Sequence, residues 1–276
     1  MHYKCPVCGK DLYSEEKRLV CEKNHSFDLA KKGYVNLLLA NQKNAKIPGD
    51  SKAMVLSRHN FLNSGYYSKL SQAVNSLVCS NLQAENKEIN ILDAGCGEGY
   101  FTANLKRCLV AWRPEAAFKV WGVDISKAAI HSAASRDREI NFSIASNHHL
   151  PFQDQVFDCL IWLFAPGNEQ EFKRVLKPGG LLLAAVPAAR HLWGLKELLY
   201  EAPYEHEVRD KAIPGFAFHS EEIVADTIEL NSSQAVNDLL LMTPYYWHIT
   251  KEAAEKAAQA EFLRTELEFC VRVYRA

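Results

Sequence analysis

Short apolar strands alternate with helical segments between residues 88 and 187, and this alternation constrains the fold more than any other feature of the sequence. Such alternating units build parallel sheets that are covered by helices on both faces. Ligands of these sheets bind beyond the carboxyl ends of the strands. We therefore expect an α/β fold with a mostly parallel sheet. The strands are predicted at EINILDAGC, FKVWGVD, NFSIAS, FDCLIWLFA and LLLAAVP.

The loop DAGCGEGY, which follows the first of these strands, indicates the kind of ligand. Its glycines, Gly95, Gly97 and Gly99, let the backbone approach a ligand closely. They follow the pattern GxGxG, whereas a dinucleotide fingerprint reads GxGxxG. Asp93 and Glu98 place negative charge where a pyrophosphate would lie, which disfavours NAD. A ligand with a cationic centre and no phosphate fits better, and S-adenosylmethionine (SAM) is such a ligand.

Polar residues at the ends of the next strands fit the same ligand. Asp124 ends the second strand, where a carboxylate can accept hydrogen bonds from both ribose hydroxyls. Each hydrogen bond to a charged group contributes roughly 1.5–3 kcal/mol. Asn147 closes the third strand, and we expect it to meet the adenine. Phe164–Pro166 ends the fourth strand, beside the expected reacting centre.

Three cysteines and a histidine near the N-terminus have the spacing C-x2-C-x12-C-x3-H, which indicates a zinc site. Thiolates and imidazole suit Zn²⁺, and four ligands close a tetrahedral shell that has no position left for a catalytic water. The zinc is therefore predicted to be structural, and to supply the folding energy of a segment too short for its own core. Zinc ribbons bind nucleic acid, bind protein or brace a fold, so the motif alone leaves its role open. The predicted ligands are Cys5, Cys8, Cys21 and His25.

Charge and apolar content limit the partners of the chain. Residues 1–60 carry 11 lysines and arginines against six acidic residues, whereas the remainder carries 21 against 27. A basic front on an acidic body can face a polyanion. No apolar run approaches the roughly 20 residues that span a bilayer, and MHYKCPVCGK has no hydrophobic signal segment. Eight cysteines without a secretion signal indicate a reducing compartment, so we expect a cytoplasmic protein with no membrane contact.

The chain divides into three predicted parts. Residues 1–36 form the zinc-binding module, residues 37–86 a helical connector, and residues 87–276 the domain with the glycine loop. KIPGDSK marks a break within the connector, after which Asp50 or Ser51 is expected to cap a helix through AMVLSRHNFL. A second helix is expected in YYSKLSQAVNSLVCSNL.

The ordered strands and loops resemble class I SAM-dependent methyltransferases, whose sheet is Rossmann-like. The N-terminal half is more specific and resembles the RlmA (RrmA) family, which are 23S ribosomal RNA guanine-N1 methyltransferases. The resemblance continues through VDISKAAIHSAA, SNHHLPF, RVLKPGG, PAARHLWGLKELLY and MTPYYWHI, and so covers nearly the whole chain. It rests on the zinc motif followed by FDLAKKGYVNLLL, PGDSKAMVLSRHNFLNSGYY and LDAGCGEGYF.

The resemblance implies particular roles. Tyr67, Gly99, Tyr100 and His191 would lie on SAM, while Gly95, Gly97 and Asp124 would shape the same pocket. The four predicted metal ligands would hold structural zinc. The partners would be a hairpin of 23S ribosomal RNA and a second copy of the chain in a homodimer. Relatives carry a basic residue and a tyrosine before AP, where this chain reads IWLFAP, so no role is carried over to those positions.

The residues after the fourth strand bear on the target atom. FAPG lacks the polar residue and the second proline of loops that methylate exocyclic amines, and no cysteine nucleophile stands there for attack on a pyrimidine carbon. A ring nitrogen remains, and guanine N1 must lose a proton on methylation. The sequence does not decide which group accepts this proton, and an Asp or Glu near the cleft, His191 and water are the three candidates. Two other functions also remain open, a small-molecule SAM methyltransferase and a non-catalytic zinc-ribbon factor that binds RNA or protein.

Overall fold

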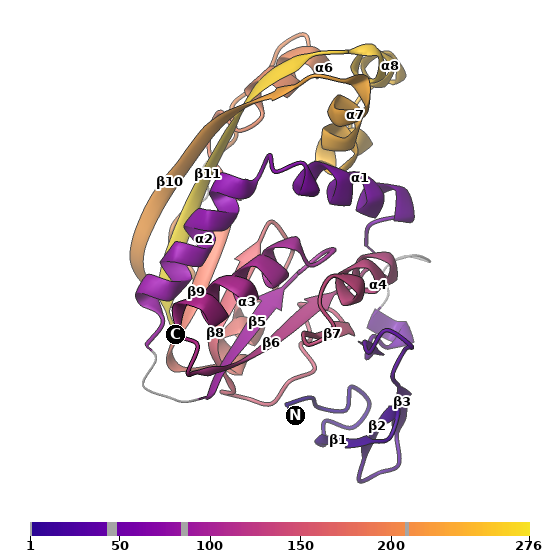
Figure 1. Ribbon diagram of the computed structural model, residues 1–276, viewed down its shortest axis with the longest axis vertical. Helices are drawn as coiled ribbons and strands as arrows, with labels where there is room; N and C mark the ends of the chain where they lie inside the picture. Colours follow the sequence, from indigo (N-terminus) through magenta and orange to yellow (C-terminus); the bar gives the residue numbers. More distant parts are fainter. Residues whose placement is uncertain (1, 43–48, 84–87, 208–209) are drawn as a thin grey trace.

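The computed structural model describes residues 2–42, 49–83, 88–207 and 210–276 (Figure 1). Within these residues an eight-stranded sheet has the order β10-β11-β9-β8-β5-β6-β7-β4. All neighbours from β9 to β4 pair in parallel, whereas β11 pairs antiparallel with both β9 and β10. This confirms the predicted mostly parallel sheet. The strands are β4 (Val35–Asn36), β5 (Glu88–Ala94), β6 (Ala117–Asp124), β7 (Asn141–Ile144), β8 (Phe157–Leu163), β9 (Leu176–Pro187), β10 (Ala217–Leu230) and β11 (Leu263–Arg275).

The two faces of the sheet have different covers. Successive side chains of a strand point to opposite faces, so Ile91 packs on one face while its neighbour Leu92 packs on the other. The first face is covered by the helices α2 (Ser68–Asn81), α3 (Tyr100–Trp112) and α4 (Lys127–Arg136). The second is covered by α5 (Glu169–Val175) and by the N-terminal module. The sequence predicted helices on both faces, and the module shares that role on the second face.

The N-terminal module is a small three-stranded sheet of β1 (Leu12–Glu15), β2 (Arg18–Cys21) and β3 (Ser26–Asp28). It lies near the β7 end of the main sheet (Figure 1), and backbone and ring contacts join it to the main body. The backbone N–H of Lys4 donates to the carbonyl of Pro151 at 2.9 Å, and the ring of Tyr3 stacks on Phe152 with centroids 5.0 Å apart. Beyond it, β4 forms the edge of the main sheet beside β7, and η1 (Ala40–Gln42) follows. The module is thus docked on the sheet through a shared core.

A helical layer lies over the carboxyl ends of the parallel strands. Between β10 and β11 the chain forms α7 (Ser233–Leu241), η2 (Pro244–Trp247) and α8 (Lys251–Gln259), which Figure 1 shows at the top of the molecule together with α6 (Trp193–Leu199). α1 (Lys52–Asn63) packs against α7 from the connector. Ser51 caps α1 by accepting a hydrogen bond from the backbone N–H of Met54. None of the helices in the described ranges is long and apolar enough to cross a membrane.

Candidate active site and zinc-binding site

A cavity of about 1140 Å³ lies at the carboxyl ends of β5, β6, β8 and β9, where the fold predicts a ligand. α1, α3, η2 and β11 also contribute to its wall, together with several loop residues. Seven of the nine predicted SAM-binding residues line it, and these are Tyr67, Asp93, Gly95, Gly97, Tyr100, Asp124 and His191. Gly99 and Asn147 are not among the lining residues. Phe164, which the sequence placed beside the reacting centre, and Glu98 of the glycine loop also line it. So do residues to which the sequence gave no role, and these include Arg58, His206, Tyr245 and Phe269.

The glycine loop is held close to the loop that follows β8. The N–H groups of Gly95 and Cys96 both donate to the carbonyl of Val123, at 2.8 and 2.9 Å. Gly95 has φ +90°, and a Cβ there would lie 2.2 Å from the Cβ of Ala165. A side chain at Gly95 would therefore push apart the two loops that form the cavity floor.

The two predicted residues outside the lining pack behind these loops. A Cβ on Gly99 would meet Ala133 of α4 at 3.0 Å, so this glycine lets α3 begin close to α4. The side-chain amide of Asn147 donates to the carbonyl of Pro166 at 3.1 Å and so supports the loop after β8. Both residues support the cavity from behind its wall.

Two carboxyl groups at the strand ends, the half-buried Asp124 and the buried Asp93, are tied to the loops around them. Asp124 accepts the backbone N–H groups of Gly97 at 3.0 Å and Ser126 at 2.7 Å. Burial raises its pKa, and these two hydrogen bonds oppose that shift. Burial raises the pKa of Asp93 to about 7, against the hydrogen bond that it accepts from the Thr102 hydroxyl at 2.5 Å.

Glu98 is a third carboxylate at this cavity and is buried, only 1% exposed. The sequence analysis used its charge to disfavour NAD but assigned it no contact with the ligand. Its Oε2 accepts hydrogen bonds from the Arg136 guanidinium at 2.5 Å and lies 2.9 Å from Nδ1 of His59. Its other oxygen, Oε1, is buried and has no hydrogen-bond partner among the described residues. An orphaned carboxylate oxygen at a cavity wall suits a positively charged ligand group.

His191 is a neutral hydrogen-bond donor at this cavity. The backbone N–H of Glu268 donates to its Nδ1 at 3.2 Å, which places the ring proton on Nε2. Burial lowers the pKa of His191 to about 3, with the nearby His206 acting in the same direction. The ring is 7% exposed and packs against Phe269, with centroids 4.4 Å apart.

A group of aromatic rings lines the side of the cavity next to β11. Phe269 of β11 lies at its centre, with ring centroids 5.3 Å from Tyr67 and 5.4 Å from Phe164. Phe164 has φ +62°, which is a strained conformation for a bulky residue, yet its side chain is 46% exposed. The indole N–H of Trp162 donates to the carbonyl of Ala165 at 2.5 Å and secures this turn. Strained residues held in this way cluster at functional sites.

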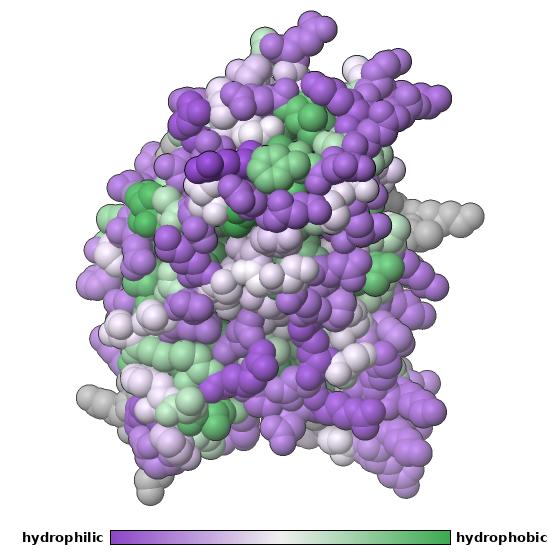
Figure 2. All heavy atoms as spheres, turned by 45° about the horizontal axis from the view of Figure 1, so that its top comes forward, coloured by the Kyte–Doolittle hydropathy of each residue, from purple (hydrophilic) through white to green (hydrophobic). Residues whose placement is uncertain are grey.

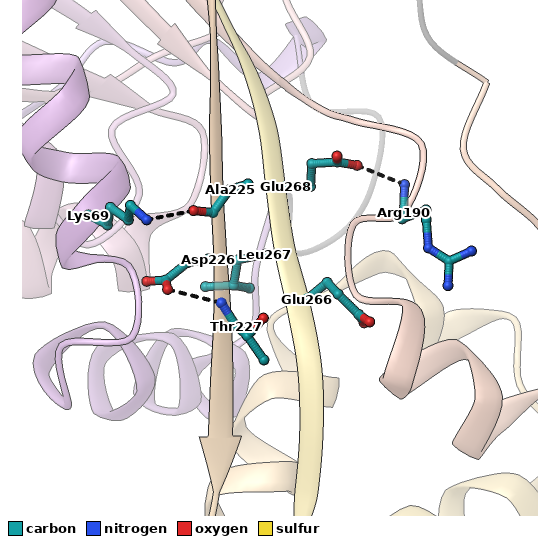
Figure 3. Close-up of a pocket in the computed structure, with 8 residues that line it drawn as sticks. All are labelled: Lys69, Arg190, Ala225, Asp226, Thr227, Glu266, Leu267 and Glu268. Atoms are coloured by element: carbon teal, nitrogen blue, oxygen red, sulfur yellow. Dashed lines mark hydrogen bonds between the residues drawn. The ribbon is translucent and has the colours of Figure 1, made fainter.

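A second hollow of about 480 Å³ lies beside β10 and β11 and has a different character (Figure 3). It is lined by polar groups of both signs that already have partners. Lys69 donates to the carbonyl of Ala225 at 2.7 Å, and the backbone N–H of Arg190 donates to the Glu268 carboxylate at 3.0 Å. This hollow supports the loop that carries His191, whereas most of the predicted SAM-binding residues line the larger cavity.

The four predicted metal ligands come together in the N-terminal module. Their ligand atoms all lie within 4.8 Å of one another. The sulfurs of Cys8 and Cys21 are 3.7 Å apart, and Nδ1 of His25 lies 3.5 Å from the sulfur of Cys5 and 3.4 Å from that of Cys21. Zinc–sulfur bonds of about 2.3 Å in a tetrahedron separate the sulfurs by roughly 3.8 Å. The donor set and its spacing therefore fit a closed, structural zinc site.

Comparison with known proteins agrees with both parts of the chain. Residues 3–46 match the zinc ribbon of the RlmA N-terminal region, and residues 85–226 match a methyltransferase domain. A 23S rRNA (guanine(748)-N(1))-methyltransferase of Streptomyces fradiae is 29% identical over 252 residues, which cover 90% of this chain and 86% of the relative. YxjB of Bacillus subtilis, whose name provisionally gives it a 23S rRNA guanine-N1 methyltransferase activity, is 30% identical over 256 residues, with 91% and 88% covered.

The fold, the glycine loop and the cavity at the strand ends define an enzyme class, that of the SAM-dependent methyltransferases. The zinc ribbon in front of this domain narrows the assignment, and so do relatives that span most of the chain. The chain belongs to the RlmA family of methyltransferases.

Proposed function

We propose that this protein transfers the methyl group of SAM to N1 of a guanine in a hairpin of 23S ribosomal RNA. One arrangement carries the proposal, namely that a single cavity joins the glycine loop and Asp124 to the exposed ring of Phe164. The first pair suits a nucleoside that carries a cation, and the ring suits a second, flat substrate. The relatives that align with about nine tenths of this chain are named for 23S rRNA guanine-N1 methylation.

The proposed SAM site uses the strand ends of β5 and β6. Asp124 would accept hydrogen bonds from the ribose hydroxyls, and the bonds from Gly97 and Ser126 hold its carboxylate in position. Oε1 of Glu98 would accept a hydrogen bond from the ammonium group of the methionine part, since it has no partner of its own. Tyr67 and Tyr100 line the same space. SAM supplies the electrophilic methyl group, and these residues hold it in one orientation.

The proposed guanine site lies against Phe164. A base extruded from an RNA hairpin leaves its stacking partners at a cost of a few kcal/mol, and an aromatic face in the cavity offsets part of that cost. Phe164, with Phe269 behind it, offers such a face. Direct transfer requires guanine N1, the methyl carbon and the sulfonium in line, so the main contribution of the protein is to position the two substrates.

The N1 proton leaves around the time of methyl transfer, and the hydrogen bonds of the cavity residues bear on which group would accept it. His191 already accepts a hydrogen bond at Nδ1 and carries its proton on Nε2, so it suits the role of donor and not that of base. Glu98 is paired with Arg136, and Asp124 accepts two backbone N–H groups. The proton therefore goes to water or to another carboxylate at the cavity. Glu169 is one such carboxylate at the cavity, and its side chain makes no hydrogen bond or ion pair with the described residues.

The zinc ribbon would contribute to RNA binding through its position on the sheet as well as through its positive charge. Its metal folds the module, and the shared core holds the module on the sheet. We further propose that the enzyme acts in the cytoplasm and as a homodimer, as the family resemblance implies. Sedimentation of the purified protein across a range of concentrations tests the homodimer.

Transfer of tritium from labelled SAM to deproteinised 23S rRNA tests the function. The proposal expects labelled rRNA, and a primer-extension stop at a guanine then locates the base. Label in a small metabolite but not in rRNA would favour a small-molecule methyltransferase. RNA binding without any transfer would favour a non-catalytic zinc-ribbon factor.

A further inference from the structure

Two exposed aromatic side chains follow one another at the rim of the active-site cavity. Tyr246 is 39% exposed and Trp247 is 65% exposed, and their ring centroids lie 5.2 Å apart in a T-shaped arrangement. Large aromatic surfaces at the solvent are costly unless they contact a partner. The activity proposed above does not by itself account for this pair.

The segment that carries the pair is firmly held. Tyr245, directly before it, is 7% exposed, and its hydroxyl lies 2.9 Å from Nε2 of His206. The backbone N–H of His248 donates to the carbonyl of Tyr245 at 2.8 Å. On the other side, Arg58 of α1 donates to the carbonyl of Met242 at 3.3 Å. The two exposed rings thus stand on a fixed turn, which lowers the entropy cost of a contact with them.

The pair directly follows a segment that lines the cavity. The four residues before it, 242–245, all line the cavity, so the exposed rings begin where that wall reaches the surface. Figure 2 brings forward the end of the molecule with α6, α7 and α8, and shows a mainly hydrophilic surface with small, separate apolar patches. Stable interfaces between protein copies need a broad contact with an apolar centre. A mainly hydrophilic surface with isolated aromatic residues suits a polar partner with individual exposed aromatic rings, such as the unpaired bases of an RNA.

We propose that Tyr246 and Trp247 stack on an unpaired nucleobase next to the target guanine in the RNA substrate. The proposal rests on the proposed function, because the extruded guanine leaves a neighbouring base without its stacking partner. Aromatic side chains stack on bases of any sequence, and the loss of one such contact weakens binding by about 5- to 150-fold. Lys251, four residues after Trp247, has a side chain that is 87% exposed and forms a loose ion pair with Glu255 at 3.7 Å. Exposed pairs of this kind are weak, so the cation is available to a phosphate of the same strand.

Steady-state methylation of a synthetic 23S rRNA hairpin tests the proposal with Trp247→Ala, Trp247→Phe and Trp112→Ala. Trp112 is a matched control, 40% exposed at the far end of α3, roughly 18 Å along that helix from the cavity. We expect Trp247→Ala to raise KM for the hairpin by about 5- to 150-fold, while Trp247→Phe restores most of the affinity. SAM affinity, measured by calorimetry, should stay within twofold in all three variants.

A second substrate identifies the contact as a base. An abasic nucleotide is placed in turn on either side of the target guanine. At one of these positions the abasic nucleotide should raise the KM of the wild-type enzyme by about as much as Trp247→Ala does. In the Trp247→Ala enzyme the same abasic nucleotide should raise KM little further. If the effects of the abasic nucleotide and of Trp247→Ala on KM were fully additive at both positions, the contact of Trp247 with a base would be overturned.

Other results would overturn the proposal as a whole. These are an unchanged KM in Trp247→Ala, an equal rise in Trp112→Ala, or a change in oligomeric state in Trp247→Ala, which would make the pair a contact between copies of the chain. If the wild-type enzyme itself left the hairpin and 23S rRNA unmethylated, the proposed function would fail first. That result is separate from any difference between the variants.

Discussion

The backbone N–H of Glu268 donates a hydrogen bond to Nδ1 of His191, 77 residues away along the chain. The same residue accepts the N–H of Ala188 on its carbonyl at 2.9 Å and the N–H of Arg190 on its carboxylate at 3.0 Å. One residue of β11 therefore holds the loop after β9 at three points and sets the tautomer of the histidine. β11 also carries Phe269. This strand therefore positions both the hydrogen-bond donor His191 and the aromatic ring of Phe269 beside the proposed guanine site.

The lowered pKa of His191 predicts a stability that depends on pH. In the folded protein the ring stays neutral down to a pKa of about 3, whereas it binds a proton near pH 6.5 when unfolded. The unfolded state thus binds more protons between these values, so stability falls as pH drops below about 6.5. Urea unfolding at pH 7.5 and pH 5 should show this loss, and His191→Gln should reduce it. An equal loss in the variant would contradict the assignment.

Asp124→Ala should weaken SAM binding by about 30- to 150-fold, because it removes the proposed acceptor of the ribose hydroxyls. The same change frees the N–H groups of Gly97 and Ser126, so part of the loss could come from the loop. Asp124→Asn keeps an acceptor oxygen and serves as the matched control. Calorimetry with S-adenosylhomocysteine measures the affinity, and a loss below threefold in the alanine variant would argue against the ribose contact.

Glu98→Gln tests the proposed contact with the ammonium group of SAM. The amide keeps the shape of the side chain but removes its charge, and SAM should bind about 10- to 100-fold more weakly. 5′-Methylthioadenosine, which lacks the amino-acid part, should bind the variant and the wild type equally. Equal losses for both ligands would instead mean that the pairing of Glu98 with Arg136 and His59 merely supports the loop.

Removal of the zinc should affect the whole protein as well as the ribbon. Cys21→Ser replaces a thiolate with a poor ligand, and elemental analysis should find one metal per chain only in the wild type. Because Leu12 and Leu19 of the ribbon share a core with Trp121 and Phe152 of the domain, the melting temperature should fall. SAM affinity should survive and rRNA methylation should decline. Cys79→Ser, a half-buried cysteine away from the metal site, should leave zinc content unchanged.

Substitution of two neighbouring lysines should have different effects on the salt dependence of RNA binding. Lys31 is exposed, whereas Lys32 donates hydrogen bonds to the carbonyl of His131 and the hydroxyl of Ser135 on α4. Lys31→Ala should lower the salt dependence of RNA binding by about one unit of slope, as expected for one lost phosphate contact. Lys32→Ala should mainly lower thermal stability. Equal slopes in both variants and the wild type, from titrations at several salt concentrations, would exclude a phosphate contact by Lys31.

The sequence by itself determined the features that depend on local spacing. The alternation of strand and helix defines the parallel sheet, GxGxG after β5 defines the loop, and the position of Asp124 at a strand end brings it to the cavity. The zinc ligands also follow from spacing, since each pair lies on one short turn. In these cases the chain geometry over a few residues is enough to bring the groups together.

Only the tertiary structure decided which distant segments complete the site. The antiparallel addition of β10 and β11 brings Phe269 beside Tyr67 and Phe164, and no local period specifies that pairing. The docking of the ribbon on the second face of the sheet, and the orphaned oxygen of Glu98, depend equally on long-range packing. Apolar burial drives such packing without direction, so the final partners are set by how all the surfaces fit together.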